Sequence, residues 1–249
     1  MGGEHVIVND VYRSPVVIAA DGANSRTRAL LYERRAPDNH AAFAVRGYAK
    51  AAVDALEIRW ERNLFPAYSW VFPIGDGRVN IGFGCLHDRL TSSRPKEQLW
   101  AALGESVTFE PIPGTLRAHR LPLTSARLSR SHGRVLFSGD ASGMINPLSG
   151  EGIYYALATG RLAGSTAALA SEDVADTYEN AVRKLFGRHF RSTNWAHRLQ
   201  RLPRNIDASV VAAERSFEVF EDLVELALGR GGLTPAIVRG VAKGWMGSI

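Results

Sequence analysis

The residues best suited to chemistry lie in one stretch, 134–164, where a short apolar strand ends at an acidic side chain and a glycine-rich loop. Residues 135–137 predict the strand, Gly139-Asp140 ends it, and a small-residue helix begins near Gly150. A helix start offers unpaired N–H groups and a positive dipole end, and glycines let a ligand approach the backbone closely. The stretch therefore predicts a site for a polar, anionic or hydroxyl-bearing ligand. Its plainer interpretation is an ordinary strand–helix crossover.

A second stretch near the N-terminus repeats this arrangement. Residues 15–20 are apolar throughout, as in a strand that is buried on both faces, and they end in Asp21-Gly22. Asn24 or Ser25 is placed to cap the helix that follows. An Asp-Gly pair alone is a common turn, so this stretch supports a ligand site only in combination with the first one.

The elements that must position these stretches follow from periodicity. Residues 5–9 predict a further strand, and alternation of apolar and polar residues predicts half-buried strands at 43–49, 56–61, 68–72 and 78–84. Gly75-Asp76-Gly77 predicts a hairpin turn between the last two. A short helix is expected over 95–103 and an extended segment over 115–124. Beyond residue 150 we expect helices over 150–170, 174–201, 212–228 and 234–245, with Gly229–Gly232 separating the last two.

Together these elements predict an α+β fold. It has an α/β core in which strands within 5–20 and 135–138 belong together, an inserted antiparallel sheet, and a helical C-terminal tail. The expected domains are a discontinuous core domain (1–37 and 125–175), the inserted sheet (38–124) and a helical region (176–249). Such a core with an insertion is typical of large flavin enzymes, which is an analogy at the level of the fold.

Composition places the chain among ordinary globular proteins. Its 249 residues suit one large domain or two small ones, with 45% apolar and 22% charged residues. The single cysteine, Cys85, excludes an internal disulfide framework and suits a reducing cytoplasm. The sequence has no C-x-x-C or H-x-x-x-H pair, so no metal site is predicted. We see no signal peptide and no uncharged apolar run of the ~18 residues needed to cross a bilayer, so we expect a cytoplasmic protein that can touch a membrane surface.

The net charge of +5 is concentrated in one predicted helix. Residues 181–206 contain no acid and seven basic residues: Arg183, Lys184, Arg188, Arg191, Arg198, Arg201 and Arg204. A basic amphipathic helix that also carries aromatic side chains indicates a membrane-surface or anionic-ligand face at 183–204. A solvated face over a normal core stripe is an equally open interpretation. No nucleic-acid-binding module accompanies the basic residues, so no nucleic-acid partner is predicted.

Two of these stretches resemble motifs of a known group of flavoproteins. Residues 17–25 together with Arg28 resemble the second FAD/NAD(P)H motif of flavoprotein hydroxylases. Gly139-Asp140, followed by the loop to Gly152, resembles their third motif, whose aspartate binds the flavin ribityl or ribose hydroxyls and whose loop passes the isoalloxazine ring. The resemblance implies a set of cofactor-binding residues: Asp21, Gly22, Arg28, Gly139, Asp140, Gly143, Pro147, Gly150, Glu151 and Gly152.

A third feature makes the resemblance specific to one family. Tyr68-x-Trp70-x-Phe72-Pro73, followed by Gly82-x-Gly84, is similar to the substrate-domain signature of the geranylgeranyl reductase family. These enzymes use reduced FAD to saturate isoprenoid double bonds, with NAD(P)H or another reductant as the electron donor. The resemblance implies that Tyr68, Trp70 and Phe72 line an apolar tunnel for a prenyl chain, with Pro73, Gly82 and Gly84 beside them. The plainer alternative is a row of aromatic side chains that pack in a core.

The proton donor for such a reduction is not identified by sequence. Cys85 is a weak candidate beside the signature, although a lone cysteine on a strand is more often a small buried residue. His87 and His119 are further candidates for the proton donor, and the sequence does not decide among the three residues.

The chain also departs from the family pattern. A Rossmann-type flavin fold begins with a G-x-G-x-x-G strand–helix unit that binds the pyrophosphate, and this sequence has none. It resembles the C-terminal part of a longer protein, with a Rossmann-like FAD-domain remnant, and we expect the chain alone to hold FAD weakly. Two alternatives stay open: a flavin-dependent monooxygenase of the same fold, and a non-catalytic fragment that binds a lipid or a partner. The oligomeric state is not predicted.

Overall fold

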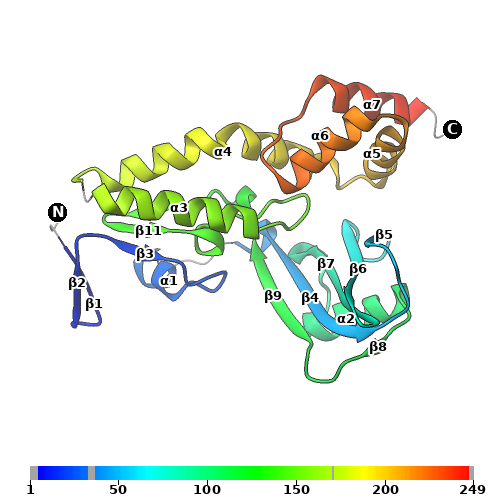
Figure 1. Ribbon diagram of the computed structural model, residues 1–249, viewed down its shortest axis with the longest axis horizontal. Coiled ribbons are helices and arrows are strands. Elements are labelled where there is room, and N and C mark those ends of the chain that lie inside the picture. The colour runs from blue at the N-terminus through cyan, green and yellow to red at the C-terminus, as the bar shows by residue number, and fades with distance from the viewer. Residues whose placement is uncertain (1–4, 33–36, 170, 247–249) are drawn as a thin grey trace. The chain divides into compact units, whose positions relative to one another are not determined.

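The computed structural model describes residues 5–32, 37–169 and 171–246 and divides the chain into two compact units (Figure 1). We call them the core unit (1–36, 122–199 and 204–249) and the sheet unit (37–121 and 200–203). The helical tail is therefore grouped with the core unit. The three functional domains proposed from the sequence stay a prediction.

The core unit contains a small sheet that joins two distant parts of the sequence. Strand β3 (Val17–Ala19) pairs in parallel with β11 (Val135–Phe137), with Ile18 opposite Leu136, and β10 (Ser131–His132) lies antiparallel on the other side of β11. This pairing confirms that the strand before Asp21-Gly22 and the strand before Gly139-Asp140 belong together. The fold class predicted from the sequence, an α+β flavoprotein-like fold, is likewise confirmed.

Two expectations for the N-terminal strands are wrong. Strand β1 (Val6–Val8) pairs with β2 (Tyr12–Ser14) in a separate hairpin and does not join the sheet of β3. The side chain of Ile18 is 40% exposed, so β3 is not buried on both faces. Side chains alternate between the two faces of a strand, so the face that carries Ile18 is left partly uncovered within the part of the chain that the structure describes.

Helices cover this sheet, and a long amphipathic helix completes the core. Helix α1 (Arg26–Tyr32) is followed much later by α3 (Ile153–Leu169) and α4 (Val174–Leu199), which lie side by side (Figure 1). The predicted cap of α1 is Ser25, whose Oγ accepts a hydrogen bond of 2.9 Å from Arg28 N. Helix α4 buries a stripe at spacings of three and four residues, as a helix that faces a core on one side must. The stripe comprises Val174, Tyr178, Val182, Phe186, His189, Phe190, Thr193 and His197.

The C-terminal tail differs from the prediction in one place. The expected helix over 212–228 is two helices, α5 (Pro203–Arg215) and α6 (Phe217–Leu228), and α7 (Pro235–Met246) follows. Proline favours the first position of a helix, so α5 begins at Pro203. Ser216 separates the two helices, because its side chain accepts a hydrogen bond from Val219 N and caps α6.

The sheet unit is an antiparallel sheet with one helix on one face. Its strands follow the order β5-β6-β7-β4-β8, and β9 (Arg117–Pro122) also pairs with β4. The other strands are β4 (Ala41–Lys50), β5 (Glu57–Glu61), β6 (Ala67–Gly75), β7 (Arg78–Leu86) and β8 (Glu110–Pro111). Asp76 and Gly77 both have positive φ, as the predicted hairpin turn requires. Helix α2 (Pro95–Ser106) packs Leu99 and Leu103 on the sheet, where both are fully buried.

Short 3-10 turns complete the described chain at Asp38–His40, His87–Arg89, Thr124–Ala126 and Gly139–Ser142, named η1 to η4. None of the helices within the described ranges has both the length and the apolar character that crossing a membrane requires.

Candidate functional site

The candidate cofactor loop begins where β11 ends and η4 turns the chain. Gly139 has φ +58° and Gly143 has φ +66°, values in the left-handed region that glycine adopts without strain. The N–H of Gly139 donates to Thr159 Oγ1 of α3 at 3.0 Å, and a Cβ on Gly139 would lie only 3.0 Å from the Cβ of Ala156. The loop therefore packs so closely on α3 that this position needs glycine for space as well as for conformation.

Asp140 lies beside the first turn of α3. A Cβ placed on Gly152 would lie 3.3 Å from Asp140 Oδ1, so the carboxylate is next to the backbone where the helix begins. The positive end of the helix dipole stabilises a carboxylate in this position. The side chain is half-buried. Asp140 and Gly152, which the sequence analysis assigned to one site, are therefore brought together by the fold.

Glu151 has a structural role that the sequence analysis missed. Its Oε1 accepts a hydrogen bond of 2.9 Å from Tyr154 N, so its side chain caps α3. One of the first-turn N–H groups is therefore already occupied. The signal was available, because a negatively charged side chain near the start of a helix is favoured by the helix dipole and can satisfy such groups.

The second motif is connected to the same loop by a buried arginine. Arg28 is 6% exposed, and its guanidinium donates from Nε to the carbonyl oxygen of Ala141 and from Nη2 to that of Ser129, both at 2.6 Å. It also lies 4.2 Å from the ring centroid of Phe137. Burial lowers the pKa of Arg28 from its ordinary value. In this structure Arg28 positions the loop, and direct contact with a cofactor stays a prediction.

Asp21 holds the start of α1. Its Oδ2 accepts a hydrogen bond of 3.0 Å from Thr27 N. Partial burial raises the pKa of Asp21, but hydrogen bonds from Thr27 and Ser25 outweigh this effect and hold the pKa below its ordinary value. Gly22 has φ +77°, and a Cβ there would meet no atom within 4 Å. The glycine is thus required by the turn and not by lack of space.

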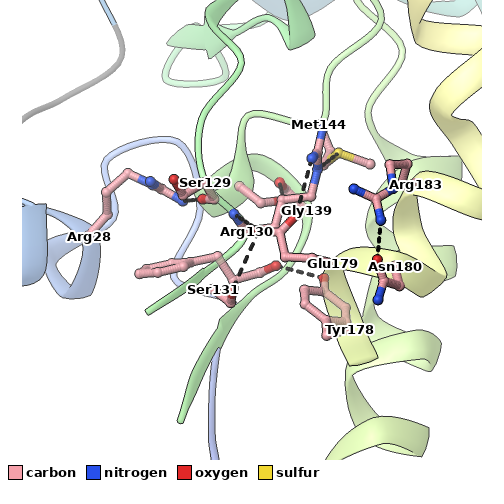
Figure 2. A network of polar contacts seen from close by, with 12 residues as sticks. Arg28, Ser129, Arg130, Ser131, Gly139, Met144, Tyr178, Glu179, Asn180 and Arg183 are labelled. Carbon is pink, nitrogen blue, oxygen red and sulfur yellow. Dashed lines mark hydrogen bonds and ion pairs between the residues drawn. The ribbon is translucent and has the colours of Figure 1, made fainter. Parts of the chain in front are cut away.

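A polar network fixes β11 and the residues just before it to α4 (Figure 2). Glu179 accepts a hydrogen bond of 2.6 Å from Arg130 N, and Tyr178 OH donates to the carbonyl of Phe137 at 2.7 Å. Arg130 Nε also lies 3.4 Å from Met144 Sδ. The segment that leads through β11 to Asp140 is therefore tied to two helices, to α1 through Arg28 and to α4 through these contacts.

A second network, which we call the Asn146 network, fixes the far end of the loop. It consists of the side chains of Asn146, Ser149, Tyr155 and His189 with carbonyl oxygens at 226–231. Asn146 is fully buried, and its amide nitrogen donates to the carbonyls of Leu226 and Ala227, each at 3.0 Å. The loop is thereby bound to the end of α6.

Two further side chains link the Asn146 network to α4. The Tyr155 hydroxyl lies 2.7 Å from His189 Nε2 and 2.8 Å from the carbonyl oxygen of Gly229. His189 Nδ1 donates to the Gly231 carbonyl at 2.7 Å. Burial raises the pKa of Tyr155 to about 12 and lowers the pKa of His189, although the Gly231 hydrogen bond and the charge of Glu225 act in the opposite direction on the histidine. Burial therefore favours the neutral form of this imidazole.

Pro147 and Gly150 complete the loop. Pro147 is buried, and its carbonyl oxygen accepts a hydrogen bond of 2.9 Å from His197 Nδ1 of α4. Gly150 has φ +73°, and its N–H donates to the Asn146 carbonyl at 2.9 Å. The fold thus gathers the loop residues from Gly139 to Gly152 on one side of α3, between Arg28 at one end and the Asn146 network at the other.

The aromatic signature lies on one face of the sheet unit. Tyr68, Trp70 and Phe72 alternate along β6 with Ala67, Ser69 and Val71, which are fully buried on the opposite face. The aromatic residues are only half-buried. Trp60 and Ile58 of β5 pair with Tyr68 and Trp70, and Trp60 is 43% exposed. This open aromatic face is therefore broader than the sequence signature indicated.

The spacing of the two glycines has a physical cause. Gly82 is directly opposite Trp70 and Gly84 is opposite Tyr68 across the strand pair. A Cβ on Gly82 would lie 2.0 Å from Trp70 Cζ2, so the indole occupies the space above this glycine. Trp70 Nε1 also donates to Asn80 Oδ1 at 2.8 Å, which fixes the ring. Gly82 and Trp70 therefore pack as a pair, in which the ring of Trp70 occupies the space that a side chain at position 82 would need.

Cys85 does not belong to this face. It is 4% exposed and packs with Val79, Ile81 and Phe83 of β7 on the face that α2 covers. Burial raises the pKa of its thiol to about 12. Because side chains on a strand alternate between faces, Cys85 points away from the aromatic row, and we do not carry it forward as a proton donor. Within the described ranges, no three His, Cys, Asp or Glu side chains gather as metal ligands would.

Comparison with solved structures identifies the class of fold. The chain matches a geranylgeranyl bacteriochlorophyll reductase-like protein from Thermoplasma acidophilum over 94% of this chain and 60% of that chain, with a TM-score of 0.69 and 19% identity. A flavin-dependent halogenase, CmlS, matches over 94% of this chain and 43% of that chain, with a TM-score of 0.53 and 18% identity. The fold is thus that of flavin-dependent oxidoreductases.

Comparison of sequences shows which flavin-dependent proteins the chain is similar to. The chain is 34% identical over 190 residues to a menaquinone reductase of Mycobacterium tuberculosis, a match that covers 70% of this chain and 45% of the relative. It is 30% identical over 202 residues to digeranylgeranylglycerophospholipid reductase 2 of Methanopyrus kandleri, covering 72% and 49%. No protein-family model matches the sequence. The predicted resemblance to the geranylgeranyl reductase family is confirmed, and the chain spans about half the length of the curated relatives it matches.

The close approach of the loop to α3 leads to a prediction for two glycines. Gly139→Ala should lower the free energy of unfolding by at least about 1–2 kcal/mol, since a left-handed residue with a Cβ is strained and the new methyl group also crowds Ala156. Gly164→Ala in α3 is the matched control, because a Cβ there meets no atom within 4 Å. It should raise stability by up to about 1 kcal/mol. Urea unfolding followed by circular dichroism measures both, and equal effects would contradict the described packing.

The buried histidine leads to a prediction for pH. The unfolded chain binds a proton at His189 near the ordinary pKa of about 6.5, while the folded imidazole has a lower pKa. Stability should therefore fall as pH decreases through about 6.5, until the folded pKa is reached, by at most about 1.4 kcal/mol per pH unit. His189→Gln should remove this part of the slope in urea unfolding at a series of pH values. His119→Gln, at an exposed histidine, should leave it unchanged. An unaltered slope in His189→Gln would show that the imidazole is not held neutral.

Proposed function

We propose that this chain is part of an FAD-dependent reductase that saturates C=C bonds of isoprenoid chains, with a prenyl lipid or a quinone side chain as substrate. The observation that carries the proposal is the position of Asp140 beside the start of α3, in a chain similar to menaquinone and digeranylgeranylglycerophospholipid reductases. The chain would contribute the flavin-ring side of the cofactor site and the surface that receives the prenyl chain.

The residues of the loop fit the polar part of a flavin cofactor. Asp140 offers carboxylate oxygens that can accept hydrogen bonds from ribityl or ribose hydroxyls, and it lies beside Gly152 where α3 begins. Gly150 and Gly152 add no side chain of their own between the backbone and a ligand. Pro147, Gly143 and the backbone of Glu151 would lie near the ring. Bound flavin would supply a hydride for the double bond, while the protein orients the reactants and excludes water. NAD(P)H or another reductant is the proposed electron donor.

The open aromatic face of the sheet unit fits an apolar chain. Trp70, Tyr68 and Phe72 present half-buried rings, with Pro73, Gly82 and Gly84 beside them. Burial of each CH₂ group of a substrate contributes about 0.8 kcal/mol, so a long prenyl chain can bind by contact area and shape without any charged partner. Because such a substrate resides in a bilayer, peripheral membrane contact through 183–204 is part of the same proposal.

Product analysis tests the proposed reaction. The purified chain is incubated anaerobically with FAD, dithionite and a lipid that carries a geranylgeranyl or menaquinone side chain, alone and with a polypeptide that carries a G-x-G-x-x-G unit. Mass spectrometry should detect the gain of two hydrogen atoms per reduced double bond. Incorporation of an oxygen atom under aerobic conditions would instead favour a monooxygenase. Absence of turnover in both preparations would favour the non-catalytic alternative.

A substitution on the aromatic face makes the test specific for the substrate. Trp70→Ala should lower kcat/KM for long prenyl substrates at least about tenfold, because the loss of a large buried aromatic contact weakens binding by more than 1.4 kcal/mol. Trp245→Ala in α7 is the matched control and should keep activity. An equal loss of activity in the two variants would contradict the assignment of this face.

A further inference from the structure

One face of α4 carries a row of exposed basic side chains. Lys184, Arg188, Arg191, Trp195 and Arg198 are all exposed and are spaced four, three, four and three residues apart. This spacing places them along one side of a helix, opposite the stripe that α4 buries in the core. We call these five residues the basic stripe. It extends over roughly 21 Å at a rise of 1.5 Å per residue.

The positive charge of the basic stripe is not neutralised within the described chain. None of its four cations has an ion pair or a hydrogen bond among the residues that the structure describes, whereas neighbouring Arg183 donates to Asn180. No acidic residue occurs from 181 to 206. An ordinary solvated helix face interleaves acids and bases at these spacings, because such pairs stabilise it. The stripe lacks this feature, so a solvated face explains it poorly.

An aromatic side chain lies within the charged row, between Arg191 and Arg198. Trp195 is 55% exposed, and Leu199, one turn further along, is 41% exposed. Exposing an indole to water is unfavourable, while the interface of a bilayer accepts its apolar body and its N–H group together. A tryptophan with cations before and after it along the helix matches a surface with anionic headgroups above an apolar layer.

We propose that the basic stripe docks this chain on the surface of an anionic lipid bilayer, with Trp195 at the headgroup level. The proposal rests on the proposed function in one respect, namely that the substrate is a lipid held in a membrane. Charge complementarity and the exposed indole of Trp195 favour a bilayer over nucleic acid, because the stripe has neither a nucleic-acid module nor a row of aromatic side chains for stacking bases.

Vesicle binding tests the proposal without any need for catalysis, so its failure is distinguishable from failure of the proposed reaction. The full chain is sedimented with vesicles of phosphatidylcholine alone and of phosphatidylcholine with 30 mol% phosphatidylglycerol (a proportion of about this size gives a surface potential like that of natural anionic leaflets). We expect binding to the anionic vesicles only, weakened by salt. The fluorescence of Trp195 should be quenched by bromolipids and this quenching should be absent in Trp195→Phe.

Matched variants assign the binding to the stripe. Lys184→Gln/Arg188→Gln/Arg191→Gln/Arg198→Gln should bind at least about a hundredfold more weakly, since each cation near an anionic surface contributes about fivefold. Arg161→Gln/Arg215→Gln/Arg239→Gln/Lys243→Gln removes the same charge from other exposed positions and should keep most of the binding. Circular dichroism and urea unfolding must match for both. Equal loss in the two variants, equal binding to both kinds of vesicle, or binding of RNA with no binding of vesicles would overturn the proposal.

Discussion

A buried guanidinium holds the candidate cofactor loop in place. A charge in the interior is costly unless its hydrogen bonds are satisfied, so Arg28 requires the carbonyl oxygens of Ala141 and Ser129 to stay where they are. Arg28 follows Asp21-Gly22 and Ala141 follows Gly139-Asp140, and the parallel pairing of β3 with β11 brings the two segments together. The position of Asp140 therefore depends on contacts between segments that are far apart in the sequence.

The other end of the loop is fixed by a different kind of interaction. Asn146, Tyr155 and His189 form a buried polar network in which each group finds partners, and such networks stabilise one arrangement only when they are fully satisfied. The carbonyl oxygens that complete it come from the end of α6 and the glycine segment after it. The helical tail thus supports the loop directly. With both ends anchored, the backbone between Gly150 and Gly152 and the carboxylate of Asp140 can face a ligand without losing their geometry.

Sequence patterns revealed those features that depend on local chemistry. The alternation of β6 and β7, the Gly75–Gly77 turn and the apolar strand before Asp140 predicted elements that the structure contains. The missed features depend on distant partners. The sequence predicts a buried Ile18, but its exposure depends on which distant segments cover that face of the sheet. His189 is an ordinary residue of an amphipathic helix by sequence, and only its contacts with Tyr155 and Gly231 reveal its role. Likewise, the Gly82 spacing in the signature was recognised as a pattern, and only the ring of Trp70 above it gives the reason.

The central claim is that the loop between Arg28 and the Asn146 network receives a flavin. Amide hydrogen exchange of the full chain, measured by mass spectrometry with and without a saturating concentration of FAD, tests this claim most directly. We expect slower exchange across residues 139–154 when FAD is present, no change in α7, and no protection in Asp140→Ala. Protection confined to other segments, such as the glycines at 82–84 or 229–232, or unaltered protection in Asp140→Ala, would contradict it.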